Sequence, residues 1–137
     1  MAEKKSLKKE KAQLLFHQLK KACQRLKEAA EQPPTVFNQD STIKRFEFTF
    51  EMTWKLMKTI IELEGLTAPS PKRAIRQAAV IDIIDNPTIW FRFLANRNQT
   101  VHTYKEEIAR KVYRAAKEFI PYVESLLEKI NKYLQTE

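Results

Sequence analysis

The stretch RNQTVHTY, residues 97–104, holds side chains that could handle a phosphate ester. Arg97 offers a planar fork of N–H donors that matches phosphate oxygens. The imidazole of His102 can take or give a proton at neutral pH. Together they form a minimal set for cutting RNA without a metal ion. The base removes the 2′-hydroxyl proton, that oxygen attacks the adjacent phosphorus, and the guanidinium stabilises the developing charge.

The same stretch also has a purely structural interpretation. Arg97 could bind carbonyl groups at a helix end, and His102 could hydrogen-bond the turn. Tyr104, two residues past the histidine, could be an ordinary surface tyrosine at a helix start. An arginine and a histidine separated by four residues are common, so the spacing alone favours this structural interpretation.

Two long predicted helices precede the stretch. Residues 6–31 carry an apolar stripe at alternating spacings of four and three, and the two prolines that follow end that helix. We expect the next helix to begin near Asp40 or Ser41, either of which is a favourable N-cap, and to end just before Gly65. It is apolar on two sides, so we expect it at the centre of a bundle or against a second copy of the chain. Its second apolar strip consists of Phe48, Met52, Leu56 and Leu63.

The third bundle position is predicted to be broken. Ser70 as N-cap and Pro71 at the first helical position begin a short helix that we expect to end near Asp85. Asn86 and Pro87 repeat the same start signal, so a second short helix follows directly. The two pieces together occupy one position of the bundle.

The last helix is predicted to begin at Thr103, because Thr103 and Glu106 have the spacing of a capping box. An apolar stripe continues from there to the end of the chain, with Pro121 inside the helix, where it should cause a kink. This start places His102 just outside the helix and Tyr104 in its first turn. Backbone N–H groups at a helix N-terminus favour anions, so the stretch is a candidate phosphate site.

These elements predict an all-α fold, an antiparallel up-and-down four-helix bundle with a broken third helix, formed by residues 1–137 as one domain. Gly65 is the one glycine in the chain, and sheets need turns that favour glycine. Hydrophobic residues make up 43% of the chain, but no apolar run approaches the ~20 residues of a membrane span. Cys23 is the one cysteine, which fits a reducing cytoplasm.

Positive charge is concentrated in two segments. Residues 1–31 hold nine Lys or Arg against four acids, and residues 72–114 again hold nine against four, so each has a balance of +5. Polyanions such as nucleic acid are the obvious ligands of such segments, although lysines that only keep helix surfaces soluble give the same charge. Residues that could extend an RNA-binding surface are Lys72, Arg73, Arg76, Arg110 and Arg114.

Signatures of most enzyme classes are absent. One cysteine and two histidines, His17 and His102, cannot form the common zinc sites, and a single glycine leaves no glycine-rich phosphate loop. We interpret Asp82 and Asp85 as helix-end and turn residues rather than as a metal pair. The sequence therefore predicts neither a metal ion nor a cofactor.

Two stretches, DSTIKRFEFTFEMTWKLMKTIIELEG at 40–65 and RNQTVHTYKEEIARKVY at 97–113, resemble the bacterial family called nucleotidyltransferase substrate-binding proteins. That family is part of the HEPN superfamily and is close to HepT-type toxins. The resemblance covers nearly the whole chain. It implies an antiparallel helical bundle, usually a homodimer, whose partner is a minimal nucleotidyltransferase of the MNT type.

In HepT-type toxins, an arginine and a histidine separated by four to six residues form the ribonuclease site, and Arg97, Asn98 and His102 match that motif. The resemblance implies that Arg97 binds the scissile phosphate, that Asn98 positions it and that His102 moves the proton. Dimerisation would place two copies of the motif across a shared cleft. In that group the partner silences the toxin by adding AMP to a tyrosine at the position of Tyr104, which would add bulk and negative charge at the RNA site.

The resemblance thus implies a metal-independent endoribonuclease toxin of a two-gene toxin–antitoxin module, inhibited by AMPylation. The family's name implies an alternative, a non-catalytic subunit that binds a nucleotide or substrate for the nucleotidyltransferase. Glu47 and Glu51, one helical turn apart, could face that site or the partner. They could equally be surface residues, with Glu51 bonded to Lys55. A third hypothesis is a helical adaptor whose 97–104 junction is structural.

Overall fold

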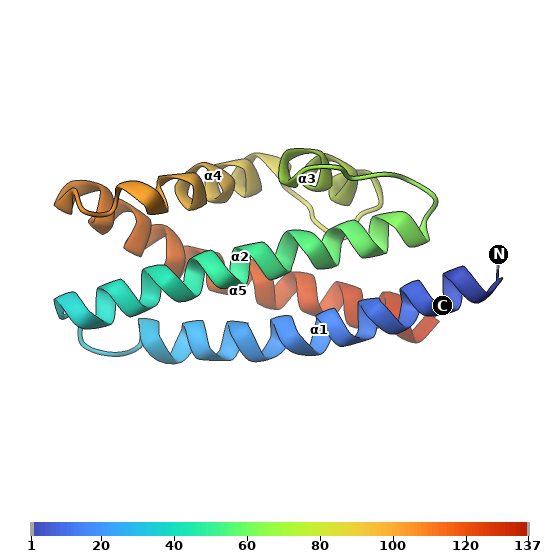
Figure 1. Cartoon of the computed structure of the whole chain (residues 1–137), viewed down its shortest axis with the longest axis horizontal. Coiled ribbons are helices and arrows are strands. Elements are labelled where there is room, and N and C mark those ends of the chain that lie inside the picture. The colour runs from blue at the N-terminus through green and yellow to red at the C-terminus, as the bar shows by residue number, and fades with distance from the viewer. Residues whose placement is uncertain (1, 137) are drawn as a thin grey trace.

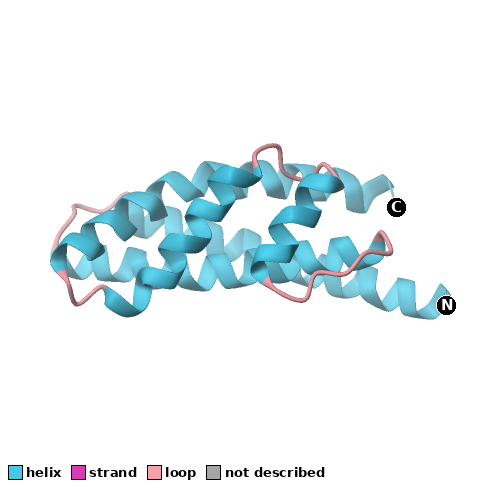
Figure 2. Ribbon diagram, turned by 90° about the horizontal axis from the view of Figure 1, so that it is seen from above, coloured by secondary structure: helices cyan, strands magenta, loops and turns pink. Residues whose placement is uncertain are grey.

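The computed structural model describes residues 2–136, which form five α-helices, one 3₁₀ helix and no strand (Figure 1). Neighbouring helix positions run antiparallel, and the first and last described residues lie at the same end of the bundle (Figure 1). Short loops join the helices (Figure 2). The all-α prediction of a four-helix bundle with a broken third helix is confirmed. The elements are α1 (Ala2–Ala30), α2 (Val36–Leu63), α3 (Pro71–Val80), α4 (Pro87–Asn98), η1 (Gln99–His102) and α5 (Glu106–Thr136).

The start predicted for α2 is wrong. Thr35 is the N-cap, and its Oγ1 accepts a hydrogen bond from the Asn38 backbone N–H at 3.2 Å. Threonine is itself a favourable cap, and it directly follows the prolines that end α1, so the helix begins at the first opportunity. The predicted caps, Asp40 and Ser41, lie inside the helix. α1 also differs at both ends from the predicted range 6–31.

Gly65 ends α2 as predicted. Its φ is +80°, in the left-handed region that favours glycine. The Gly65 N–H donates to the carbonyl of Glu62 at 3.0 Å, and the Leu66 N–H donates to the carbonyl of Ile61 at 3.1 Å. This pair of bonds is a Schellman motif, which satisfies carbonyl groups at the helix end.

The break in the third position also follows the predicted caps. Ser70 accepts from the backbone N–H of Arg73, Asn86 accepts from that of Thr88, and a proline follows each cap. α3 ends at Val80 rather than near Asp85. The reason is a backbone turn two residues later, where Asp82 has a φ of +63° and cannot continue a right-handed helix.

An aromatic cluster centred on Phe119 joins α5 to α2 and α4. Its ring centre lies 5.2 Å from that of Phe46 and 5.8 Å from that of Phe50, both on α2. It lies 5.7 Å from Trp90 and 5.0 Å from Phe93, both on α4. Such pairs stabilise a core beyond simple area burial, each by about 0.5–1.5 kcal/mol. The cluster therefore fixes α4 against α2 and α5 close to the candidate site.

Candidate functional site

The junction between α4 and α5 contains a 3₁₀ helix in place of the predicted capping box. The chain passes from α4 directly into η1, and α5 begins at Glu106 instead of Thr103. The Thr103 hydroxyl donates to the carbonyl of Thr100 at 3.1 Å, and the Thr100 hydroxyl donates to the carbonyl of Arg97 at 2.8 Å. Thr103 therefore ends η1 rather than capping α5, and the capping-box prediction is wrong.

The later start of α5 changes where His102 and Tyr104 lie relative to the helix N-terminus. His102 is the last residue of η1, and Tyr104 lies in the turn before α5. The first turn of α5 carries Glu106 and Glu107, whose carboxylates already supply the negative charge that a helix N-terminus favours. These acids weaken the attraction of the α5 N-terminus for a further anion, and Arg97 is the basic side chain of the predicted site at the junction.

Arg97 links α4 to α2. Its Nη2 donates to Oε2 of Glu51 at 2.6 Å, and its Nη1 donates to Oδ1 of Asn98 at 3.1 Å. The guanidinium carbon lies 5.8 Å from the ring centre of Phe50, within the range of a cation–π contact. The side chain is 28% exposed. Arg97 is therefore held in one orientation while part of its guanidinium faces solvent.

Glu51 is the anionic partner in this arrangement. Burial raises the pKa of Glu51, but the Trp54 indole, the hydrogen bond and charge of Arg97 and the charge of Lys55 together lower it below the ordinary value. Trp54 Nε1 is buried and has no hydrogen-bond partner of good geometry among residues 2–136, so Arg97, at 2.6 Å, is the firm hydrogen-bond partner of Glu51. The expected pair with Lys55 is present at 3.6 Å. Glu51 therefore carries its negative charge at neutral pH.

A surface groove of about 410 Å³ brings together four of the six predicted site residues. Glu47 and Glu51 line it from α2, and Arg97 and Asn98 line it from α4. Its remaining wall consists of Phe48, Thr100 and Val101, which no motif in the sequence had assigned to the site. Its volume lies within the range of about 300–1,000 Å³ typical of small-molecule sites. We call this the Arg97 groove.

His102 and Tyr104 lie outside the walls of the Arg97 groove. Both are exposed, Tyr104 at 77%. Their ring centres are 6.2 Å apart in an edge-to-face arrangement. A single chain thus presents its histidine and tyrosine as a pair beside the groove, and it does not place His102 in the groove with Arg97.

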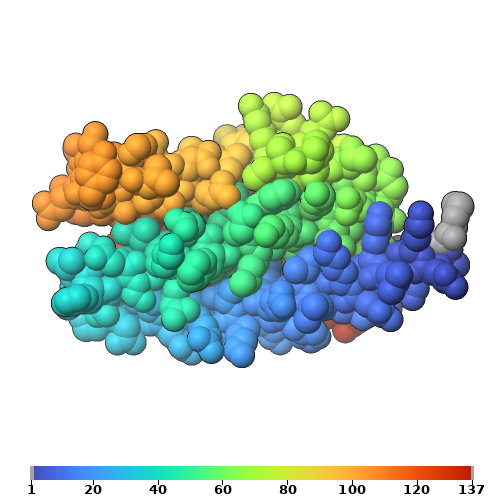
Figure 3. Space-filling model, viewed as in Figure 1, coloured from blue at the N-terminus to red at the C-terminus, as the bar shows by residue number. Residues whose placement is uncertain are grey.

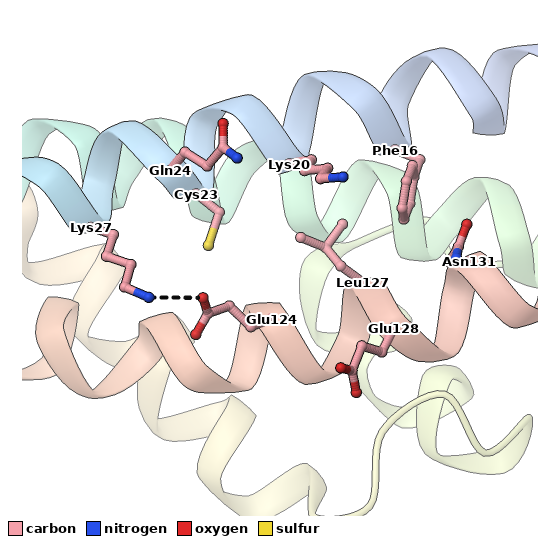
Figure 4. A pocket seen from close by; sticks show the side chains of 9 residues that line it. All are labelled: Phe16, Lys20, Cys23, Gln24, Lys27, Glu124, Leu127, Glu128 and Asn131. Atoms are coloured by element: carbon pink, nitrogen blue, oxygen red, sulfur yellow. Dashed lines mark hydrogen bonds and ion pairs between the residues drawn. The ribbon is translucent and has the colours of Figure 1, made fainter.

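Cys23 offers no competing chemistry. It points between α1 and α5, near the ion pair that Lys27 and Glu124 form at 3.4 Å (Figure 4). Burial, followed by the charge of Glu124, raises the pKa of Cys23 to about 11, so the thiol stays protonated at neutral pH and is a poor nucleophile. Residues 2–136 contain no group of three or more His, Cys, Asp or Glu that could hold a metal ion. They also contain no helix with the length and hydrophobicity needed to cross a membrane.

The chain matches one family model and several known proteins. The model described as "Nucleotidyltransferase substrate binding protein like" matches residues 14–132, which include both the 40–65 and the 97–113 stretch. The "Probable ribonuclease HepT" of Haemophilus influenzae is 30% identical over 95 residues, which are 66% of this chain and 65% of that protein. The aligned part therefore spans just under two thirds of that relative's length.

Two solved structures share the fold. A crystal structure of a Thermus thermophilus protein has a TM-score of 0.77 and 34% sequence identity, and covers 81% of this chain and 97% of that one. A Haemophilus influenzae structure, described as revealing the fold of a substrate binding domain of a nucleotidyltransferase, has a TM-score of 0.66 and 24% identity. It covers 90% of this chain and 98% of that one. At that identity, the second likeness supports the fold alone.

Proposed function

Since the chain belongs to the family of nucleotidyltransferase substrate-binding-like proteins, we propose that it is the HEPN-type partner of a minimal nucleotidyltransferase in a two-gene toxin–antitoxin module. In this proposal it is a metal-independent endoribonuclease of the cytoplasm, and the partner silences it by AMPylation. The observation that carries the proposal is the fixed, partly exposed guanidinium of Arg97 at an open groove, with an exposed His102 on the adjoining turn. Similarity to a probable ribonuclease HepT supports it.

Arg97 would bind the scissile phosphate. A guanidinium has five N–H donors, and within residues 2–136 the Arg97 side chain donates two hydrogen bonds, to Glu51 and Asn98. The remaining donors are free to bind phosphate oxygens from the groove. Because Glu51 and Asn98 already fix the orientation of the fork, little side-chain entropy is lost when the phosphate binds. Asn98 lines the same groove and would orient the same phosphate.

His102 would move the protons. As a base, its imidazole takes the proton of the 2′-hydroxyl, the 2′-oxygen attacks phosphorus, and the bond to the 5′-oxygen breaks. A second imidazole protonates that leaving oxygen, which gives a 2′,3′-cyclic phosphate and a free 5′-hydroxyl. One chain supplies one His102 outside the Arg97 groove. The proposal therefore requires a homodimer in which two junctions share a cleft.

Tyr104 would be the regulatory site. Its side chain is 77% exposed and its ring lies 6.2 Å from that of His102. The nucleotidyltransferase would transfer AMP from ATP to the phenolic oxygen and release pyrophosphate. The added phosphate would stand beside the histidine and repel the phosphate of an RNA substrate.

A second candidate function is supported by the carboxylates of the groove. Glu47 and Glu51 line the same surface as Arg97, and a mixed wall of acids and one arginine could bind a nucleotide through its ribose hydroxyls and phosphate. In that case the protein would present a substrate to the nucleotidyltransferase without cleaving RNA, in keeping with the family's description.

Expression of the protein alone, beside a His102→Ala variant, separates the two functions. The matched control is His17→Ala, because His17 is the other histidine and is exposed on α1, far along the chain from the junction. We expect growth arrest and RNA cleavage from the wild type and the control, and neither from His102→Ala. Absence of toxicity and cleavage in all three, with nucleotide binding retained, would instead establish the substrate-binding subunit.

A further inference from the structure

A second groove lies across α2 from the Arg97 groove. Phe48 lines both the Arg97 groove and this second groove, of about 400 Å³, between α2 and α1. The second groove shares Lys21, Arg25 and Arg45 with a third groove, of about 430 Å³, nearer the α1–α2 loop. In Figures 1 and 3, α2 lies between α1 on one side and α4 with η1 on the other. The two grooves therefore lie on either side of Phe48, and the basic side chains of α1 line the one farther from Arg97.

The positive charges in the grooves between α1 and α2 are not paired with acids. Within residues 2–136, Lys21, Arg25 and Arg45 form no ion pair. Glu28 is the one acid that lines the two α1–α2 grooves. Arg45 is half-buried as a residue and has no carboxylate partner within residues 2–136. A polyanion would supply the missing partner for these cations.

Phe48 adds an exposed aromatic surface between the two sets of cations. Its side chain is 48% exposed, and Lys44 Nζ lies 5.2 Å from its ring centre. Met52 lies one turn further along α2 and is also only partly buried. Aromatic rings set among cations bind single-stranded nucleic acid, because every base can stack and every phosphate attracts a cation. A protein partner fits less well, since charged residues are depleted from the centres of protein interfaces.

We propose that this surface, formed by Lys21, Arg25, Arg45 and Phe48 and called the α1–α2 strip, binds the single-stranded RNA that flanks the phosphate held by Arg97. The inference rests on the proposed function, in which the substrate is RNA. Phe48 stacks on a base next to the scissile phosphate, and the three cations contact successive phosphates beyond it. Packed helices lie about 8–10 Å apart, so the path from α4 across α2 to α1 is about 16–20 Å long. A dinucleotide cannot reach along it.

The direct test is the affinity of the His102→Ala protein, which does not cleave in the proposed mechanism, for two uridine probes. One probe is a dinucleotide, and the other has about 12 nucleotides, a length typical of single-strand binding surfaces. We expect the longer probe to bind more tightly. Arg25→Glu with Arg45→Glu should reduce that advantage about tenfold and lower the magnitude of the salt slope by about 1 to 2. Phe48→Ser should reduce it at least about fivefold.

The matched control is Lys8→Glu with Lys132→Glu. This pair makes the same change in charge at two exposed lysines that line none of the three grooves. Circular dichroism checks that each variant is folded. An equal loss of affinity in the control would overturn the inference, because binding would then follow net charge and not the strip. Unchanged RNA affinity in the strip variants, together with weaker dimerisation or weaker nucleotidyltransferase binding, would also overturn it.

Failure of the proposed function has a different signature. If the wild type cleaves no RNA but the longer probe still requires Arg25, Arg45 and Phe48, the ribonuclease proposal is wrong and the strip is an RNA-binding surface. If the wild type cleaves RNA and the strip variants bind the longer probe as the wild type does, the strip is wrong and the ribonuclease proposal is unaffected.

Discussion

The grooves on the two sides of α2 hold two arginines in opposite electrostatic states. Arg97 is tied to Glu51 at 2.6 Å, whereas Arg45, similarly half-buried, pairs with no acid within residues 2–136. Phe48 lines both the groove that contains Arg97 and the groove that contains Arg45. A paired arginine is oriented in advance but must share its charge, which suits the positioning of one phosphate. An unpaired arginine keeps its full charge but not a fixed direction, which suits general attraction of a polyanion.

The strongest test of this contrast compares Arg97→Ala with Arg45→Ala in RNA cleavage. Loss of a group that stabilises charge in the transition state lowers kcat by about 100- to 1,000-fold, so we expect that result for Arg97→Ala. Arg45→Ala should raise KM several-fold and leave kcat within about twofold, because its contact is the same in the ground state and the transition state. Steady-state kinetics on one RNA substrate measures both parameters. A loss of kcat in both variants would remove the distinction between the two grooves.

A smaller effect is expected from Glu51→Gln. The amide still accepts a hydrogen bond from Arg97 but carries no charge that competes with phosphate, so RNA affinity should rise about three- to fivefold, or about 1 kcal/mol. Glu47→Gln is the matched control, because Glu47 lines the same groove but pairs with Lys44 at 3.3 Å. Fluorescence titration of the His102→Ala background measures the affinity. A fall in affinity for Glu51→Gln would show that the carboxylate orients Arg97 more than it competes.

The same variant has a defined pH signature. Because the pKa of Glu51 is lowered in the folded protein, its carboxylate stabilises the fold above the unfolded pKa, and that contribution is lost as the pH falls through the folded value. The wild type should therefore be slightly more stable than Glu51→Gln at neutral pH and should lose that advantage below about pH 4. Urea unfolding of both proteins across this range measures the difference. A constant difference at every pH would exclude the ion pair as its source.

The contrast between Arg97 and Arg45 could not be predicted from the sequence. Ser70, Pro71, Asn86 and Pro87 predicted the broken third position correctly because caps and prolines act within one helical turn. The contact between Arg97 and Glu51 spans 46 positions, and no local pattern encodes which carboxylate packs against which arginine. Predicting the Arg97 groove required the crossing of α2 and α4, which side-chain packing in the core determines.

The threonine caps show the same limit on a shorter scale. Thr35, Asp40 and Ser41 are all favourable caps, and the cap pattern alone does not show which of them the helix uses; in the structure it is Thr35. Thr103 satisfies the capping-box pattern with Glu106, but a 3₁₀ turn occupies the junction and engages its hydroxyl. A correct local pattern therefore gave a wrong helix start where two short-range structures competed for the same residue.

The smallest expected effect is the difference in stability between substitutions of these two threonines. Thr35→Ala removes an N-cap hydrogen bond at the start of the helix that forms both grooves and should lower the free energy of unfolding by about 1 kcal/mol. Thr103→Ala removes only a hydroxyl bond to the Thr100 carbonyl and should lower it by less than about 0.5 kcal/mol, because a carbonyl in a partly exposed turn can bind water instead. Urea denaturation of both variants measures this difference. If Thr103→Ala costs as much as Thr35→Ala, Thr103 does cap α5, and His102 and Tyr104 return to the helix N-terminus that the sequence predicted for them.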